Sequence, residues 1–167
     1  TTFNELGMTN ASTGNLFNGK NFASAYLGNQ TNQEVVANMP KRLGKDNISI
    51  AAGGILASAR DLHIWNNALF NNEIINPKSL SEFTKTYKKT NHYILDSVGY
   101  GLGIMISNKN VTSYLHTGYV KGSPSLNIYY PNKKTSVVIL SNIADESRGK
   151  KTIFKTHRLI KLKVDSL

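Results

Sequence analysis

The chain has 167 residues, 40% of them hydrophobic and 18% charged, which is enough for one domain with a hydrophobic core. No apolar run approaches the ~18 residues that cross a bilayer, and the absence of cysteine excludes disulfides, thiolate metal sites and a cysteine nucleophile. The formal net charge of +10 would suit a polyanionic partner, so the position of the basic residues along the chain matters.

Residues 1 to 50 are rich in Asn, Gly, Thr and Ser and contain only short apolar pieces, such as Phe22-Tyr26-Leu27 and Val35-Val36. The composition predicts an irregular segment. Such a long loop-rich stretch is uncommon inside a compact domain unless it forms the wall of a site or belongs to something larger. Because the chain opens at Thr1 without an initiator methionine or signal-peptide pattern, we expect an upstream segment in the parent protein.

Residues 51–90 are predicted to be helical. Ser58 is a good N-cap, and Asp61 three residues later completes a capping-box pattern. Helical spacing then places three apolar residues on one face, namely Leu62, Trp65 and Leu69. A second helix starts with Asn76 as cap and Pro77 at the first helical position. Its predicted buried stripe consists of Leu80, Phe83 and Tyr87.

From Val98 the hydrophobic period changes to two. Four runs of β type follow, separated by turn-rich segments: Tyr100 to Ser107, Thr112 to Thr117, Ser125 to Tyr130 and Thr135 to Ser141. Their short connections require antiparallel neighbours. The sequence therefore predicts an α+β fold in which helices precede an antiparallel sheet of about four strands, and a C-terminal helix packs on that sheet.

The C-terminal helix is predicted from Glu146 to Lys163, with Ile153, Ile160 and Val164 on its apolar side. Seven of the twenty basic residues fall in this stretch: Arg148, Lys150, Lys151, Lys155, Arg158, Lys161 and Lys163. A solvated helix face explains them best. A nucleic-acid partner is not expected because the aromatic interleaving of RNA-binding modules is missing, and no observation in the sequence supports contact with a membrane surface.

Several kinds of catalytic site are unsupported. There is no Gly-x-Ser-x-Gly elbow, and His63, His92, His116 and His157 are too isolated to predict a metal site or cofactor. His63 is expected to be a surface or packing residue, and we assign no function to His92 and His157. Ser58 is interpreted as a helix cap rather than a nucleophile. The alternating glycines of residues 99–103 indicate a strand against which another backbone packs closely.

One tripeptide, His116-Thr117-Gly118, ends a predicted strand and is followed by Tyr119 and Gly122. The motifs that precede and follow it along the chain indicate how it should be interpreted. In order, the chain shows Leu6-Gly7-Met8-Thr9-Asn10, Ala52-Gly53-Gly54-Ile55, Ser58-Ala59-Arg60-Asp61-Leu62, Tyr100-Gly101-Leu102-Gly103, the tripeptide, and Val137-Val138-Ile139-Leu140-Ser141-Asn142. This succession resembles the class C β-lactamase family, which includes penicillin-binding D-alanyl-D-alanine carboxypeptidases, esterases and D-amino-acid peptidases.

The resemblance implies that the whole chain, residues 1–167, is the C-terminal portion of one β-lactamase/transpeptidase-like domain. The family's Ser-x-x-Lys nucleophile and Tyr-x-Asn motif should precede Thr1, so we expect the chain alone to lack them. Tyr130-Pro131-Asn132 matches Tyr-x-Asn only as letters and is interpreted as a hairpin connection. By resemblance, His116, Thr117 and Gly118 bind substrate, and the backbone N–H of Tyr119 forms part of an oxyanion hole.

The resemblance also implies a serine acyl-transfer hydrolase, located in the periplasm or outside the cell, that acts on D-Ala-D-Ala peptides or β-lactams without a cofactor. Two alternatives remain open: a non-catalytic binding module, or part of a family esterase or D-aminopeptidase. Because the family sheet takes its first strands from the upstream segment, we expect an uncovered strand edge and apolar surface here. The expected partner is the missing N-terminal half or a second copy of the chain.

Overall fold

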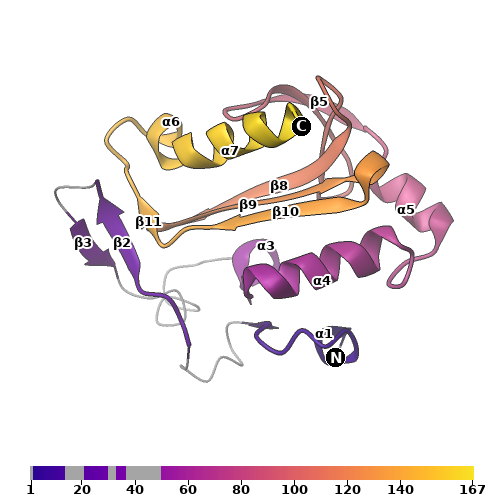
Figure 1. The fold of residues 1–167 in the computed structure, drawn as a ribbon, viewed down its shortest axis with the longest axis horizontal. Coiled ribbons are helices and arrows are strands. Elements are labelled where there is room, and N and C mark those ends of the chain that lie inside the picture. The colour runs from indigo at the N-terminus through magenta and orange to yellow at the C-terminus, as the bar shows by residue number, and fades with distance from the viewer. Residues whose placement is uncertain (1, 14–20, 30–32, 37–49) are drawn as a thin grey trace.

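The computed structural model describes residues 2–13, 21–29, 33–36 and 50–167. Its central element is a six-stranded antiparallel sheet in the order β10-β9-β8-β7-β6-β5. The strands are β5 (Lys88–His92), β6 (Asp96–Tyr100), β7 (Met105–Ser107), β8 (Ser113–Val120), β9 (Ser123–Tyr130) and β10 (Thr135–Leu140). Helix α4 (Ala59–Phe70) covers one face, while α6 (Lys150–Ile153) and α7 (Lys155–Asp165) cover the other (Figure 1). The fold is α+β, as predicted.

The hydrophobic core lies between the sheet and helices α6 and α7. Its most buried members come from β8 and β9, with Leu115 at 1% exposure and Leu126 and Ile128 at 0%. Phe154, the residue between the two helices, is also buried in this core. The opposite face of the sheet meets α4 through aromatic stacking, because Phe70 lies flat against Tyr129 at 4.1 Å between ring centroids. These contacts hold β8 and β9 rigidly in the middle layer.

Helix α4 begins as predicted. The Ser58 hydroxyl accepts the backbone N–H of Asp61 at 3.1 Å, and the Asp61 carboxylate accepts the Ser58 N–H at 3.1 Å and the Ser58 hydroxyl at 2.6 Å. Three turns later the helix ends with Asn71 as C-cap. The capping box and the start of the helix are confirmed, because they depend on residues that are close together in the sequence.

Helix α5 (Pro77–Phe83) also starts as predicted, with the Asn76 side chain accepting the N–H of Ser79 at 2.8 Å. Its predicted buried stripe is wrong: no residue of α5 is fully buried, Leu80 and Phe83 are half-buried, and Tyr87 is exposed. The helix stops at Phe83, so Tyr87 lies beyond it and is 53% exposed. Thr84, the C-cap, also donates its hydroxyl to the Leu80 carbonyl at 2.9 Å. The helical region therefore ends before residue 90.

The sheet has two more strands than predicted. β5 and β6 form a hairpin with the register Lys88↔Tyr100 to His92↔Asp96. β5 reads Lys-Lys-Thr-Asn-His and has no apolar alternation, so the hydrophobic pattern did not reveal it. The predicted run from Tyr100 to Ser107 is broken at Gly103, whose φ of 84° forms a turn between β6 and β7. The close backbone approach is confirmed, since a side chain at Gly101 would meet the Phe83 carbonyl.

The C-terminal helix starts later than predicted and is divided at Phe154 into α6 and α7. Ile153 is buried and Val164 packs against the core, but Ile160 is 37% exposed, contrary to prediction. The restart at Phe154 changes the helical phase, so α7 turns His157 and Lys161 inward. No helix within the described ranges is long and apolar enough to cross a membrane.

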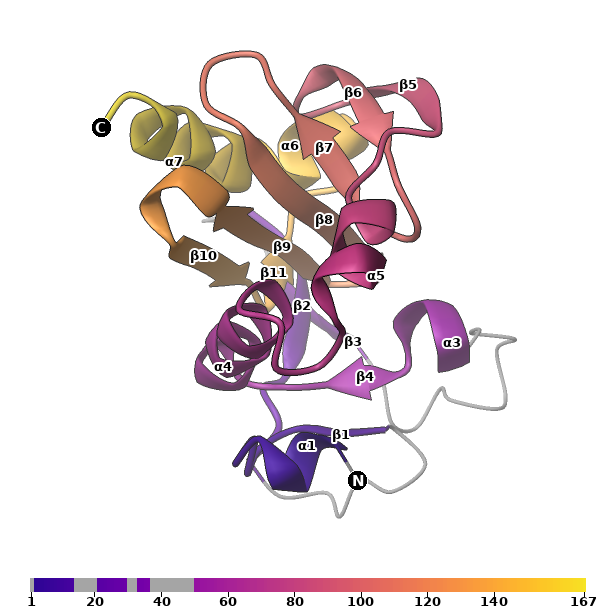
Figure 2. The same cartoon turned by 90° about the vertical axis from the view of Figure 1, so that its right-hand side faces the viewer.

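The N-terminal region is less irregular than predicted where it is described. β2 (Ala25–Gly28) and β3 (Gln33–Val36) form an antiparallel pair, and β11 (Ile143–Ala144) joins β2 in parallel. β1 (Ser12–Thr13) pairs with β4 (Ile55–Leu56). Two short helices, α1 (Thr2–Glu5) and α3 (Ile50–Gly53), complete this part; α1 and β1 lie below α4 in Figure 2. Residues 14–20, 30–32 and 37–49 of the predicted irregular segment are outside the described residues.

Candidate active site

The His116-Thr117-Gly118 tripeptide lies within β8, not at its end as predicted, because β8 continues to Val120. β9 pairs with β8 up to Val120, whereas β7 pairs only with residues 113 to 115. Beyond Leu115, therefore, no strand of the described chain pairs with the β7 side of β8. The tripeptide lies on a local edge that exists because β7 is short.

The backbone of Tyr119 points toward this edge. Pro124, directly opposite Tyr119, accepts the Ser141 N–H at 3.0 Å and therefore faces β10. In an antiparallel pair, opposed residues either exchange both hydrogen bonds or both point their polar groups outward. Since Pro124 points outward and has no N–H, Tyr119 directs its own N–H and C=O away from β9. This is the orientation that an oxyanion donor on the β7 side requires.

Thr117 is 9% exposed, and its hydroxyl has two side-chain neighbours. The Tyr93 hydroxyl lies 3.0 Å from Thr117 Oγ1, and His92 Nε2 lies 3.1 Å from it. Both come from the end of the β5–β6 hairpin, which the sequence did not predict. His92, to which the sequence assigns no function, thus contacts the motif through its ring. Burial lowers the pKa of His92, and the nearby His116 and Lys150 lower it further.

His116 is exposed and lies across the end of β7. Its Nδ1 is 2.7 Å from the Thr117 carbonyl, which can only accept, so Nδ1 carries a proton and donates. Nε2 lies 2.9 Å from the Tyr100 hydroxyl on β6. In the neutral ring Nε2 accepts the Tyr100 proton. Both ring nitrogens of His116 thus have a hydrogen-bond partner at the edge of β8. Tyr100 reaches the site from β6, which is separated from β8 by β7 in the sheet.

Gly118 has no room for a side chain. A Cβ atom there would lie 2.6 Å from Ser125 Oγ on the paired strand β9. Ser125 in turn donates weakly to the Gly118 carbonyl at 3.4 Å. Glycine at this position therefore leaves room for the Ser125 hydroxyl close to β8, besides leaving the surface of the motif flat for an approaching ligand.

A wall of aromatic rings flanks the motif on the side of α6. Phe154 contacts Tyr93 and Tyr119, with ring centroids 4.8 and 6.3 Å apart. The ammonium group of Lys150 lies 4.9 Å from the centre of the Tyr93 ring, a cation–π geometry. The Tyr119 hydroxyl donates to Glu146. The site thus combines a hydroxyl, an edge-directed backbone amide and two basic side chains, an arrangement suited to an anionic or carbonyl-bearing ligand.

The letters Ser-x-x-Lys do occur once in the chain, at Ser147–Lys150, contrary to the expectation that the chain lacks this pattern. The geometry differs from a Ser–Lys pair on one helical turn. Gly149 between them has a φ of 60°, and α6 starts only at Lys150. Ser147 is engaged by its own turn, with its N–H donating to Asp145 at 2.9 Å. Lys150 instead lies over Tyr93.

The remaining candidates are structural. Ser58 has its hydroxyl committed to Asp61, so it is a cap and not a nucleophile. His63 bridges α4 to β10 through Ser136, 2.5 Å away, as a surface packing residue. His157 lies in the core. Tyr130-Pro131-Asn132 enters the short 3₁₀ helix η2 (Pro131–Lys133) between β9 and β10, confirming the hairpin connection.

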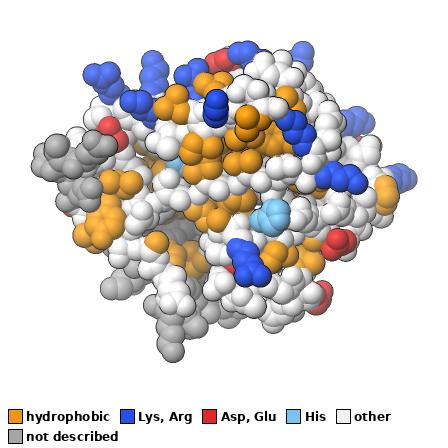
Figure 3. All heavy atoms as spheres, viewed as in Figure 1, with side chains coloured by type: hydrophobic (Ala, Val, Ile, Leu, Met, Phe, Trp, Pro, Cys, Tyr) orange, Lys and Arg blue, Asp and Glu red, His pale blue; other side chains and the backbone are white. Residues whose placement is uncertain are grey.

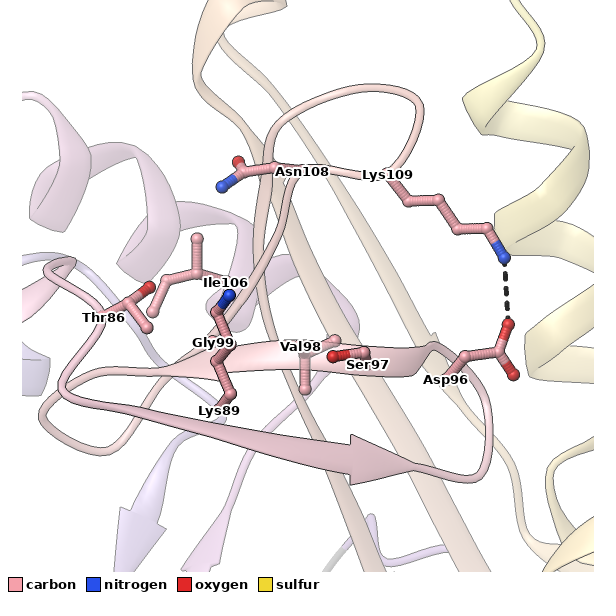
Figure 4. A pocket seen from close by; sticks show the side chains of 9 residues that line it. All are labelled: Thr86, Lys89, Asp96, Ser97, Val98, Gly99, Ile106, Asn108 and Lys109. Atoms are coloured by element: carbon pink, nitrogen blue, oxygen red, sulfur yellow. Dashed lines mark hydrogen bonds and ion pairs between the residues drawn. The ribbon is translucent and has the colours of Figure 1, made fainter.

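A hollow of about 400 Å³ lies elsewhere, on the outside of the β5–β6–β7 region (Figure 4). Its lining includes Thr86, Lys89, Ser97 and Asn108, but none of residues 116 to 119. Lys109 and Asp96 form an ion pair of 3.0 Å at its rim, with side chains 67% and 73% exposed. Such exposed pairs contribute little. Among the described residues no group of three His, Asp or Glu side chains is arranged to hold a metal ion.

Comparison with known proteins begins with a family model. The model described as Beta-lactamase matches residues 1–159, which is nearly the whole chain and includes every residue of the candidate site. A search of curated protein sequences gives no match.

Solved structures share the fold at low sequence identity. A D-amino acid amidase from Ochrobactrum anthropi SV3, complexed with L-phenylalanine amide, superposes with a TM-score of 0.73 at 21% identity, covering 98% of this chain and 49% of that protein. An octameric penicillin-binding protein homologue from Pyrococcus abyssi gives 0.69 at 21% identity, covering 95% and 36%. A D-stereospecific amidohydrolase from Streptomyces sp. gives 0.66 at 22% identity, covering 84% and 41%. The chain thus spans about half or less of each of these proteins.

Proposed function

The chain belongs to the Beta-lactamase family of serine hydrolases, and from this premise we propose that it is the C-terminal part of an acyl-transfer enzyme of the β-lactamase or D-Ala-D-Ala carboxypeptidase type. The geometry at the end of β7 carries the proposal. There β8 has no paired strand on its β7 side among the described residues, the backbone of Tyr119 points to that side, and Thr117 precedes it by two residues on the same strand. His116, Thr117 and Gly118 bind the substrate, and the Tyr119 N–H stabilises the oxyanion, a contribution typically worth roughly 10² to 10³ in rate.

The attacking serine is supplied by a segment outside this chain. Ser147 is the one serine here with a lysine three residues later, and the turn at Gly149 keeps the two off a common helical face. A nucleophile needs a base within hydrogen-bond reach, and Lys150 is directed to the Tyr93 ring. The chain alone should therefore not turn over substrate.

The partner that completes the enzyme is the N-terminal half of the same domain. The chain spans only 36–49% of the three solved structures described above, so a complementary part at least as large as this chain fits the same fold. β10 ends the sheet and offers an edge to a further strand.

From the family resemblance we also propose that the complete protein is located outside the cytoplasm. Fractionation of intact cells would test this location.

The proposal is tested with a fluorescent penicillin, which acylates the serine of this class of enzyme. The chain alone should remain unlabelled, and labelling should appear when the upstream half is added. In the combined protein Thr117→Val should reduce labelling at least tenfold, whereas Ser147→Ala should leave it unchanged. Labelling of the isolated chain at a defined serine, Ser147 above all, would contradict the assignment.

Hydrolysis of D-amino acid amides is the second candidate. Two of the solved structures that share the fold are a D-amino acid amidase and a D-stereospecific amidohydrolase, which favours this reading over an ester substrate. Turnover of a D-amino acid amide by the combined protein, without penicillin labelling, would select it. If neither reaction occurs and the upstream segment lacks a serine–lysine pair, the remaining alternative is a binding module that retains the fold.

A further inference from the structure

Two residues outside the tripeptide control the state of the Thr117 hydroxyl. His92 and Tyr93 are 25 and 24 residues away in sequence, yet both lie within 3.1 Å of Thr117 Oγ1. Their rings also lie against one another, with centroids 4.0 Å apart, and Phe154 packs on Tyr93 from α6. The half-buried pair is therefore held in place by packing as well as by its hydrogen bonds.

The hydrogen bonds of His92 determine which of its nitrogens carries the proton. The backbone N–H of Ile94 donates to Nδ1 at 3.3 Å, so Nδ1 must present a lone pair. A neutral ring then has its proton on Nε2, and Nε2 donates to Thr117 Oγ1. Burial, together with the positive potential of His116 and Lys150, lowers the pKa of His92 and keeps the ring neutral.

This tautomer limits what Thr117 can do. A threonine hydroxyl has one proton and two lone pairs, and His92 occupies one lone pair. When the Tyr93 hydroxyl donates to the second lone pair, the Thr117 proton has only one direction left, away from both residues. Thr117 then serves an incoming ligand as a hydrogen-bond donor and has no lone pair to offer it. A ligand group that accepts hydrogen bonds is favoured over one that must donate. Between two acceptors, an ionised carboxylate oxygen is favoured over a carboxamide oxygen, because a hydrogen bond to a charged acceptor is stronger.

We propose that His92 and Tyr93 are positioning residues that fix Thr117 as a donor and make this site prefer a carboxylate over the corresponding carboxamide. The inference rests on the proposed function, since it concerns the group that Thr117 binds there. Lys150 supports the anionic class, because its ammonium group lies 4.9 Å from the Tyr93 ring centre and adds positive charge beside the motif.

The first test is independent of catalysis. In the ¹⁵N-labelled chain at pH 7, the His92 ring should show Nε2 protonated and Nδ1 unprotonated, with the Nε2–H signal shifted by Thr117→Val. A ring protonated at Nδ1, or an imidazolium at this pH, would overturn the proposal whatever the enzyme does.

The second test uses the chain combined with its upstream half and compares an N-acyl-D-alanyl-D-alanine with its C-terminal amide. His92→Leu should raise KM for the acid about tenfold, with kcat within about twofold and the amide nearly unaffected. His92→Gln, which retains an N–H donor, should restore most of the loss. Tyr93→Phe should raise KM for the acid several-fold. His63→Leu, a histidine variant away from the site, should leave both substrates unchanged.

The outcomes distinguish a failure of the inference about His92 and Tyr93 from a failure of the proposed function. An equal loss for acid and amide, or no rescue by glutamine, would mean that His92 only supports the fold, and the inference would fail. If the wild-type combined protein turns over neither substrate, the proposed function fails. In that case the Kd values of N-acyl-D-alanine and its amide, measured by NMR titration of the Thr117 amide signal, take the place of KM with the same expected ratio.

Discussion

At the residue scale, His157 shows what burial does to a titratable group. It is 1% exposed, its ring meets Phe154 edge-on at 5.5 Å, and its Nε2 lies 3.4 Å from Ser141 Oγ. Burial lowers its pKa below the ordinary value of 6.5. No carboxylate of the described chain forms a salt bridge with it. The imidazole is therefore a buried core side chain whose neutral form is favoured in the folded chain.

The lowered pKa makes stability depend on pH. Above about pH 6.5 both states of the chain hold a neutral His157, so it adds no pH dependence. As pH falls through 6.5 the unfolded chain takes up the proton first, and the free energy of unfolding decreases until the folded pKa is reached. Urea midpoints measured from pH 7.5 to 5 should fall. His157→Phe should flatten part of this slope, and His92, whose pKa burial also lowers, should contribute to the remainder.

An unchanged slope in His157→Phe would show that the proton uptake belongs to other groups.

Single residues also show which parts of the site could be predicted from the sequence and which could not. Ser58 and Asn76 were identified as caps because their partners lie three residues away. His116, Thr117 and Gly118 were found through their order in the chain. His92 and Tyr93 were missed because a hairpin without hydrophobic alternation carries them to Thr117.

At the element scale, α7 has an unusual distribution of side chains. It buries Lys161, whose ammonium lies 2.5 Å from Asp165, with side chains only 5% and 7% exposed. The Tyr130 hydroxyl donates to the other Asp165 oxygen at 2.8 Å. Burial, more than this bond, raises the pKa of Tyr130. On its outer face α7 exposes Leu159 and Leu162. Helical periodicity alone predicts the opposite arrangement.

The buried pair predicts a specific pattern of stability. Lys161→Met leaves the Asp165 carboxylate buried without its cation and should cost about 3–5 kcal/mol of unfolding free energy. Adding Asp165→Asn removes that charge while keeping an oxygen to accept from Tyr130, so the double variant should recover most of the loss. Lys163→Met, an exposed neighbour, should change stability by less than about 0.5 kcal/mol.

Urea denaturation of the three variants provides the comparison. Equal losses in the single and double variants would mean that Lys161 contributes by packing its methylene chain, not by charge.

At the scale of the whole molecule, the free edge of the sheet and an apolar surface are present together. β10 is the last strand in the sheet order, and its residues Val137, Val138 and Ile139 are only half-buried. Hydrophobic side chains also appear at the surface over the region of α7 and β10 (Figure 3). Leu140, Leu159 and Leu162 are 42%, 56% and 45% exposed. An edge strand and exposed apolar side chains are thus both present among the described residues, as expected.

This surface predicts the behaviour of the isolated chain. It should bind a hydrophobic dye and elute larger than an 18.4 kDa monomer. Leu159→Lys with Leu162→Lys should reduce the dye signal at least twofold, and addition of the N-terminal half should reduce it further. Arg158→Lys, a substitution next to Leu159 that keeps the charge, should have no effect. A monomeric elution volume together with negligible dye binding would contradict the prediction.

The sequence by itself determined the α+β class, the starts of α4 and α5, the hairpin at Pro131 and the family motif, because these depend on neighbouring residues or on motif order. Tertiary structure alone decided that β7 ends early, that Tyr100, His92 and Tyr93 reach the motif, and that α7 turns Lys161 inward. These features depend on strand register and helical phase. Both are set by contacts between residues distant in sequence, which local patterns do not encode.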